Sequence, residues 1–140
     1  MKNFRNSRQR QIILDAVRNR RDHPTADEIY LDVRAKDGRI SRGTVYRNLG
    51  ILSETGEILN VKVPAADRYD FHVDKHYHIY CTECGRTFDA PLDYRPEDDK
   101  QVQAQSGFQI RRHRLVFEGL CPDCLEKESN GEKFMPEPGR

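Results

Sequence analysis

The sequence has no apolar stretch approaching the roughly 18 consecutive residues that cross a membrane. Basic residues stand near the N-terminus, but no apolar run follows them, so the pattern of a secretory signal is missing as well. These two absences argue against membrane-spanning and secreted proteins. We therefore expect a cytoplasmic protein.

Large apolar residues are also scarce. Hydrophobic residues make up 36% of the chain and charged residues 34%. Leu, Ile, Val and Phe together number 31 of 140 residues, which is close to the level at which chains stay disordered. Each half of a chain built as two small domains would need help from a bound metal or a partner subunit.

The net charge of +1 hides an uneven distribution. Residues 1–50 contain twelve Lys and Arg against six Asp and Glu, a balance of +6, whereas residues 51–140 contain twelve against seventeen, a balance of −5. A basic N-terminal region suits a polyanion such as DNA. A solvated basic surface would have the same composition, so only the local sequence patterns can distinguish it from a DNA-binding region.

The basic region begins with the apolar spacing of two helices. Apolar residues recur at helical intervals from residue 8 to about residue 20, and Ser7 is the expected N-cap of this first helix. Thr25 and Glu28 form a capping-box pattern at the start of the second helix, which we expect to end near Gly38.

A third helix and a hairpin follow. Ser41 is the expected N-cap of this helix, which should end around Gly56. Residues 57–63 and 68–71 are typical of two short strands, and together they predict a β-hairpin wing. Three helices with a tight turn before the third match helix-turn-helix architecture, in which the third helix enters the major groove. An arbitrary three-helix cluster would show the same apolar pattern.

Polar residues of the third helix and of the N-terminus are candidates for contacts with DNA. Arginine binds guanine edges with two hydrogen bonds, tyrosine and threonine can contact thymine methyl groups, and N-terminal basic residues could reach phosphates or the minor groove. A basic helix is usually only a solvated helix, but this one stands at the recognition position. The candidates are Arg5, Arg10, Arg42, Thr44, Tyr46 and Arg47.

The acidic part of the chain has a different pattern. Residues 77–80 and 86–88 are strand-like, residues 96–105 are polar and compatible with a helix, and residues 108–117 alternate as a strand. This order predicts a small α+β unit. Residues 126–140 are charged and contain two prolines, so we expect a flexible tail there.

All four cysteines fall in two C-x-x-C pairs, Cys81 with Cys84 and Cys121 with Cys124. In a reducing compartment such pairs indicate zinc ligands before disulfides. Four thiolates suit tetrahedral Zn²⁺, and a closed four-sulfur site is structural because no position is left for a substrate. A thiol redox pair is the alternative, which the absence of a thioredoxin-like βαβ pattern disfavours, and an iron–sulfur or rubredoxin-like centre is another.

His76 and His78 stand two residues apart, so on a strand both side chains leave the same face and can converge on one ion. Imidazoles and carboxylates together suit Fe²⁺ or Mn²⁺, and also Zn²⁺. Other candidate ligands have ordinary explanations when taken singly, His23 as a turn residue and Asp70 or Asp89 as surface charges. Spacing alone therefore supports only the histidine pair.

Five segments, in this order, strongly resemble the ferric uptake regulator superfamily. They are HPTADEIY at residues 23–30, TVYRNL at 44–49, RYDF at 68–71, HYHIYCTECG at 76–85 and GLCPDC at 119–124. The resemblance runs from about residue 7 to residue 124. It implies an α+β protein with an N-terminal winged helix-turn-helix domain and a small C-terminal α/β dimerisation domain with a structural zinc site.

The same resemblance implies boundaries and partners. The DNA-binding domain would span residues 1–71, a hinge residues 72–75, the dimerisation and metal-binding domain residues 76–126, and a flexible tail residues 127–140. The protein would act as a homodimer, a metal-dependent repressor that binds a double-stranded DNA operator. We expect it not to be an enzyme.

Within the superfamily the sequence is most similar to the peroxide-responsive branch. The residues at the positions of that branch's regulatory Fe²⁺ or Mn²⁺ site are His23, Asp70, His76, His78 and Asp89. A further site of many ferric uptake members would need other residues where Lys75 and Tyr77 stand, so we expect that site to be absent, with His113 as a remnant. No cysteine is spare for the sensory site that zinc-uptake members use.

The resemblance also implies a mechanism. One ion shared by two domains would select the closed arrangement of the dimer, which matches the recognition helices to a palindromic operator. Peroxide would oxidise a ligand histidine, with His23 and His76 the candidates, and release the DNA. Two alternatives stay open, namely an iron-uptake repressor without peroxide chemistry and a mononuclear metalloenzyme, for which the sequence offers no evident pocket motif.

Overall fold

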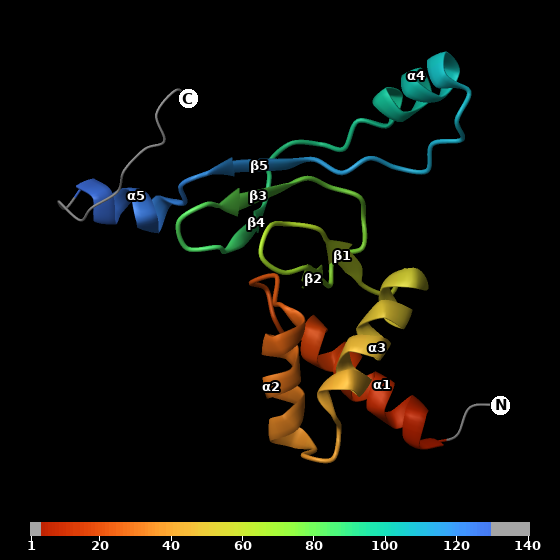
Figure 1. Ribbon diagram of the computed structural model, residues 1–140, viewed down its shortest axis with the longest axis vertical. Coiled ribbons are helices and arrows are strands. Elements are labelled where there is room, and N and C mark those ends of the chain that lie inside the picture. Colours follow the sequence, from red (N-terminus) through yellow and green to blue (C-terminus); the bar gives the residue numbers. More distant parts are fainter. Residues whose placement is uncertain (1–3, 130–140) are drawn as a thin grey trace.

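The computed structural model of the chain describes residues 4–129, with side chains from residue 7 onward. Three helices and a hairpin form a helical half, residues 4–71, which lies below a sheet half, residues 76–129, in Figure 1. The two halves together are a mixed helix and strand fold. Among the residues described, no helix combines the length and the apolar character that a membrane span requires.

The helical half is built around one apolar core. Helices α1 (Phe4–Arg18), α2 (Ala26–Lys36) and α3 (Arg42–Glu54) cross one another and bury the apolar stripes that their sequences predict. The fully buried side chains of this core include Ile13, Val17, Ile29, Val33, Val45 and Leu49.

Two of the three predicted helix caps are confirmed. The Glu28 amide donates to the Thr25 hydroxyl, and the Thr25 amide donates to the Glu28 carboxylate, which completes the capping box of α2. The Ser41 hydroxyl accepts from the Thr44 amide at 3.1 Å and caps α3. These caps fix where the two helices begin.

The third predicted cap is wrong. Ser7 lies inside α1, because this helix already begins at Phe4. Arginine and glutamine, which surround Ser7 in the sequence, are good helix formers, so the helix continues through a residue that elsewhere would cap it.

A short hairpin closes the helical half on the side that faces the sheet half. Strands β1 (Leu59–Val61) and β2 (Arg68–Asp70) pair antiparallel, with Leu59 opposite Asp70. The Tyr69 amide donates to the Pro24 carbonyl at 2.9 Å, which attaches β2 to the loop before α2. Both segments are therefore held side by side at the boundary between the halves.

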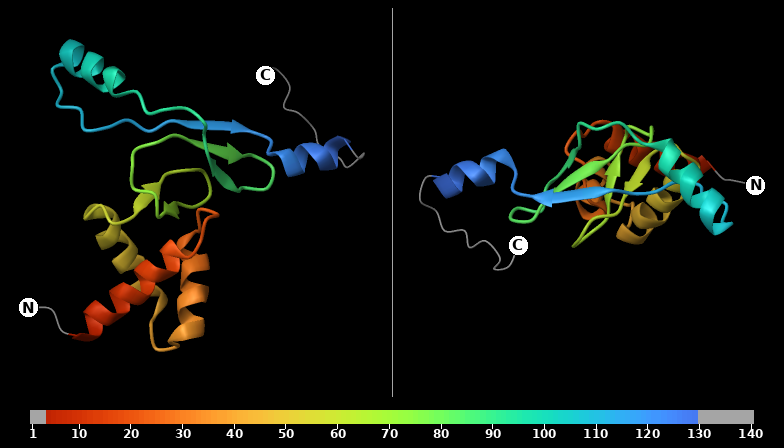
Figure 2. Two further views of the ribbon diagram at one scale, coloured as in Figure 1. Left: turned by 180° about the vertical axis from the view of Figure 1, so that it is seen from behind. Right: turned by 90° about the horizontal axis from the view of Figure 1, so that it is seen from above.

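The sheet half is a three-stranded sheet in the order β4-β3-β5. Strands β3 (His78–Cys81) and β4 (Thr87–Asp89) pair antiparallel, and β5 (Val116–Gly119) pairs parallel to β3. Helices α4 (Pro96–Ser106) and α5 (Pro122–Ser129) extend from opposite ends of this sheet, as Figure 2 shows. Strand β5 is an edge strand.

The sheet half differs from the prediction at two places. Of the strand expected over residues 108–117, only residues 116–117 lie in β5, because β3 is four residues long and offers no partner for the rest. The flexible tail expected from residue 127 overlaps helix α5, which continues to Ser129. Residues 130–140 lie outside the described residues.

Candidate functional site

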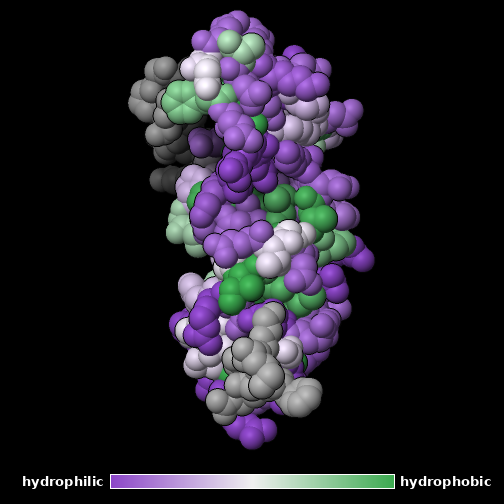
Figure 3. Space-filling view, turned by 90° about the vertical axis from the view of Figure 1, so that its right-hand side faces the viewer, coloured by the Kyte–Doolittle hydropathy of each residue, from purple (hydrophilic) through white to green (hydrophobic). Residues whose placement is uncertain are grey.

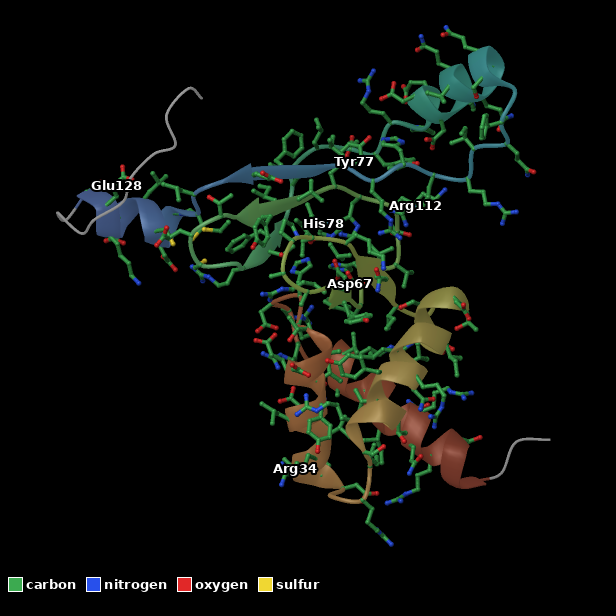
Figure 4. All side chains as sticks on the ribbon, viewed as in Figure 1. Arg34, Asp67, Tyr77, His78, Arg112 and Glu128 are labelled. Atoms are coloured by element: carbon green, nitrogen blue, oxygen red, sulfur yellow. The ribbon has the colours of Figure 1, made fainter. Side chains whose placement is uncertain are left out.

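The five predicted regulatory ligands meet where the two halves face each other. His23 stands in the loop before α2 and Asp70 ends β2, while His76 precedes β3, His78 begins it and Asp89 ends β4. One ligand atom from each of the five lies within 4.8 Å of those of the other four. Figure 4 shows His78 at mid-height, between the hairpin and the sheet.

The two carboxylates lie between the imidazoles. His23 Nε2 is 3.1 Å from Asp70 Oδ2 and 2.8 Å from Asp89 Oδ1. His76 Nε2 is 3.0 Å from Asp70 Oδ2 and 2.9 Å from Asp89 Oδ1. His78 Nε2 is farther away, 3.6 Å from each of these oxygens. Each carboxylate is therefore shared by side chains from both halves.

Local structure orients the ligands of the sheet half. His78 and Asp89 are direct cross-strand partners, so their side chains leave the same face of the sheet. His76 Nδ1 lies 2.5 Å from the Asp74 carbonyl, which fixes the ring with Nε2 toward the site. The His72 amide donates to Asp70 Oδ1 at 2.9 Å and leaves the other oxygen facing the histidines.

The donor set fits a divalent metal ion. His78 Nε2 is buried and has no hydrogen-bond partner among the described residues, although a buried polar atom without a partner is costly. A cation held by His23, Asp70, His76, His78 and Asp89 would satisfy that atom and balance the two carboxylates. Three nitrogen and two oxygen donors suit Fe²⁺, Mn²⁺ or Zn²⁺.

The pKa values of the cluster follow from burial and charge. Burial alone would raise the pKa of Asp70, but the hydrogen bonds from His23 and from the His72 amide outweigh it and hold the pKa well below its usual range. Burial alone would lower the pKa values of His23 and His76, but both are raised. At His23 the two carboxylates outweigh burial, and at His76 the Asp74 carbonyl does so together with the two carboxylates. Protons therefore compete with a cation for these nitrogens.

The site is most open to solvent at Asp89. The side chains of His23, Asp70 and His78 are 8%, 4% and 6% exposed, whereas that of Asp89 is 45% exposed. Asp89 and His76 line a pocket of about 320 Å³. A small molecule can approach the cluster from this side.

The four cysteines form the second constellation, beside α5. The Sγ atoms of Cys81 and Cys124 are 3.8 Å apart, as are those of Cys84 and Cys121. Zinc bound to sulfur at 2.3 Å with tetrahedral geometry gives sulfur–sulfur distances of about 3.8 Å. These two distances match a tetrahedral zinc site, and all four sulfur atoms lie within 4.8 Å of one another. Figure 4 shows the sulfur atoms together near the start of α5.

The sulfur cluster needs a cation to ionise fully. Burial would raise the pKa of Cys81, but the Cys84 and Cys121 amides donate to its Sγ and lower the pKa to about 6. Burial and the neighbouring sulfurs raise the pKa of Cys124 to about 12. The Arg86 side chain, which was not among the predicted site residues, donates to the Sγ atoms of Cys84 at 3.3 Å and Cys121 at 3.2 Å. A divalent ion would remove the remaining repulsion.

The exposed side of α3 carries the candidate DNA contacts. Arg42, Tyr46 and Arg47 are exposed, and Thr44 is half-buried. The Asp27 carboxylate of α2 accepts hydrogen bonds from both Arg42 and Tyr46, the second at 2.7 Å. No local pattern in the sequence points to Asp27, because its partners are 15 and 19 residues away.

The two N-terminal candidates differ. Arg10 donates from Nε to the buried Asn48 side chain at 2.8 Å, so it connects α1 to α3. This contact gives Arg10 a structural role that the sequence did not indicate. Arg5 lies in α1, and its side chain is outside the described residues.

Comparisons with known proteins agree with one another. The model of the ferric uptake regulator family matches residues 1–118. The chain is 35% identical over 123 residues to the peroxide operon regulator of Bacillus subtilis (strain 168), covering 87% of this chain and 85% of that protein. It is 33% identical over 120 residues to the peroxide-responsive repressor PerR of Staphylococcus aureus (strain USA300), covering 85% and 81%.

Among solved structures, the chain is similar to the Campylobacter jejuni peroxide stress regulator. The TM-score is 0.70 and the sequence identity 26%, over 86% of this chain and 91% of that one.

We expect His78→Ala to weaken binding of Mn²⁺ at the His/Asp site at least about tenfold, because a buried ligand is lost. The matched control is His72→Ala, since the exposed His72 ring lies outside the ligand set and only its backbone amide contacts Asp70. Titration of each full-length variant with Mn²⁺, monitored by electron paramagnetic resonance, measures the two affinities. Equal affinities in the two variants would contradict the assignment of His78.

We expect Cys84→Ser to lose most of its zinc and to unfold at a lower denaturant concentration, because zinc binding contributes directly to the folding free energy. Glu83→Gln, at the exposed neighbouring position, should keep both properties. Elemental analysis gives the zinc content, and urea titration gives the unfolding midpoint. A zinc-free Cys84→Ser protein with an unchanged midpoint would show that the cluster is not structural.

Proposed function

Since the chain belongs to the ferric uptake regulator family, we propose that it is a metal-dependent transcriptional repressor that responds to peroxide. One observation carries this function: three histidines and two aspartates from both halves of the molecule converge on a single site. The names of the relatives at 33–35% identity favour peroxide over iron uptake as the signal.

The division of the ligands between the halves is the basis of the switch. His23 and Asp70 come from the helical half, and the other three ligands come from the sheet half. The ligand set is therefore complete only when the halves are arranged as described. Metal binding favours that arrangement over any in which the ligands are separated.

The regulatory ion would be Fe²⁺ or Mn²⁺ by the chemistry of its donors. Bound Fe²⁺ would supply the redox chemistry that peroxide sensing requires, which Mn²⁺ would not. The chain contributes the access route, because the pocket beside Asp89 and His76 admits a small oxidant. It also holds His23 and His76 next to the carboxylates, as the candidates for oxidation.

The helical half is the proposed DNA-binding domain. We assign a winged helix to residues 1–71, with α3 as the recognition helix and β1-β2 as the wing, followed by a hinge at residues 72–75 and a dimerisation domain at 76–126. The exposed α3 residues Arg42, Tyr46 and Arg47, with Thr44, are the proposed base and phosphate contacts. Arg5 and Arg10 are proposed phosphate contacts.

A structural zinc at the four cysteines belongs to the same proposal. The sulfur spacing and the need of the thiolates for a cation support it. Reduced thiols are maintained in the cytoplasm, which is the proposed location.

A homodimer is supported by the edge of the sheet. Strand β5 has a free edge among the described residues, and unpaired strand edges are templates for pairing with another chain. Phe117, on β5, is 43% exposed, and Leu115, just before β5, is 39% exposed. Phe108 is 70% exposed. Figure 3 shows a separate feature of one face, hydrophobic surface at mid-height, near the level where the two halves meet. A second copy would cover β5 and place two α3 helices on one operator.

A mononuclear metalloenzyme is the remaining alternative from another class. It would need a substrate beside the ion, and the pocket at Asp89 and His76 is the place for one. The family relatives do not favour an enzyme. Peroxide treatment distinguishes the enzyme from the repressor, because only a repressor couples the His/Asp site to DNA affinity.

We expect peroxide to abolish DNA binding of the Fe²⁺-loaded protein but not of the Mn²⁺-loaded protein. The DNA probe is the duplex sequence that the Mn²⁺-loaded protein selects from a random library. Loss of the closed state should weaken binding at least about tenfold, because the apparent dissociation constant rises as the competent fraction falls. Fluorescence anisotropy measures binding, and mass spectrometry of peptides containing His23 or His76 should show one added oxygen atom.

The Mn²⁺-loaded protein is the control, since it should keep both its DNA affinity and its histidine masses. If the Fe²⁺-loaded protein also keeps its affinity and gains no oxygen on any histidine peptide, the peroxide response is wrong.

We expect Phe117→Arg to convert the dimer to a monomer, because it places a charge in the apolar surface beside the β5 edge. Glu118→Arg is the matched control, because successive strand residues face opposite sides of a sheet. Light scattering after size-exclusion chromatography gives the mass. A dimeric Phe117→Arg protein would contradict this interface.

A further inference from the structure

We propose that Arg68 is a positioning residue for the regulatory metal site, which it links to the first cysteine pair. The inference rests on the proposed function, since it assumes that the His/Asp cluster binds a divalent ion. Arg68 begins β2 and is not itself a ligand. Its side chain is 16% exposed.

The guanidinium of Arg68 spans the two halves of the molecule. Its Nη1 donates to the His23 carbonyl at 3.1 Å, within the helical half. Its Nη2 donates to the Gly85 carbonyl at 2.9 Å, in the sheet half. The planar fork of arginine can donate in two directions at once, which the single ammonium of lysine does less well.

The first contact fixes an unusual backbone. His23 has φ of 54°, in the left-handed region that residues other than glycine adopt rarely, and it precedes Pro24, which restricts it further. Such a conformation persists only where its surroundings determine it. The Arg68 hydrogen bond to the His23 carbonyl, together with the bond from the Tyr69 amide to the Pro24 carbonyl, supplies this restraint from β2. The direction of the His23 imidazole depends on it.

The second contact reaches the turn that presents two cysteines. Gly85 has φ of 79°, and its amide donates to the Cys81 carbonyl at 2.9 Å, which closes the turn through Cys84. Arg68 therefore holds the backbone of the turn that carries Cys81 and Cys84. Arg68 joins a ligand of the regulatory site in one half to the proposed zinc site in the other.

The charge of Arg68 and its positioning of His23 predict opposite changes in metal affinity when the side chain is removed. A positive charge near a cation site weakens metal binding, so its removal would strengthen binding if charge dominated. Glu28, whose Oε1 lies 3.9 Å from Arg68 Nη1, balances part of this charge. If Arg68 acts by positioning His23, its removal weakens binding instead. The sign of the change separates the two explanations.

The test is Mn²⁺ affinity of the zinc-loaded full chain, measured by electron paramagnetic resonance, in the wild type, Arg68→Met, Arg68→Lys and Arg114→Met. Arg114 is the matched control because its Nη1 also crosses between the halves, to the Asn60 carbonyl at 2.6 Å, and among the described residues it makes no hydrogen bond to a ligand residue. We expect affinity to fall about tenfold in Arg68→Met, with unchanged zinc content. Arg68→Lys should recover only part of this loss, and Arg114→Met should lose less than Arg68→Met.

Three results would overturn the inference: unchanged or tighter Mn²⁺ binding by Arg68→Met, full recovery in Arg68→Lys, or an equal loss in Arg114→Met. If Arg68→Met folds poorly, the Mn²⁺ affinity of Arg68→Lys is the test. Wild-type affinity in the Arg68→Lys protein then contradicts the inference. If the wild type itself binds no Mn²⁺, the proposed function fails. The link between the halves is then tested by small-angle scattering of metal-free protein, where an unchanged radius of gyration in the Arg68 variants overturns it.

Discussion

The structure depends on the carboxylates of Asp70 and Asp89, which lie between three imidazoles at the boundary of the two halves. Asp70 is buried in the helical half, yet its Oδ2 atom faces histidines of both halves. A buried carboxylate is unfavourable unless it is paired and hydrogen-bonded. The arrangement of the halves is thereby coupled to whatever cation, proton or metal, balances these charges.

The sheet half is organised around sulfur instead of an apolar core. Its buried cluster consists of Cys81, Cys121 and Cys124, with Phe88 and Leu120 packed against it, whereas the helical half buries a full set of aliphatic side chains. The low content of large apolar residues predicts this need for another source of stability. The same strand, β3, carries His78 at one end and Cys81 at the other, so the stability of the sulfur site affects the geometry of the His/Asp site.

Local patterns predicted much of the fold, and their failures have local causes. Capping at Thr25 and Ser41 was predicted correctly because a cap depends on hydrogen bonds within four residues. The predicted cap at Ser7 is wrong because a residue able to cap a helix can also lie within one. The alternation over residues 108–117 predicts one long strand, but β5 is short because a strand extends only as far as its partner, and that segment does not contain the length of β3.

The sequence by itself determined the features that are close in the chain: two cysteine pairs, two histidines at strand spacing, a third helix with basic exposed positions and, through the order of its motifs, the family. Tertiary structure decided what these features touch. It brought His23 to Asp89 across 66 residues and placed Arg68 between the His23 and Gly85 carbonyls. Spacing along the chain restricts direction only within a helix or strand, whereas these contacts depend on how separate elements pack.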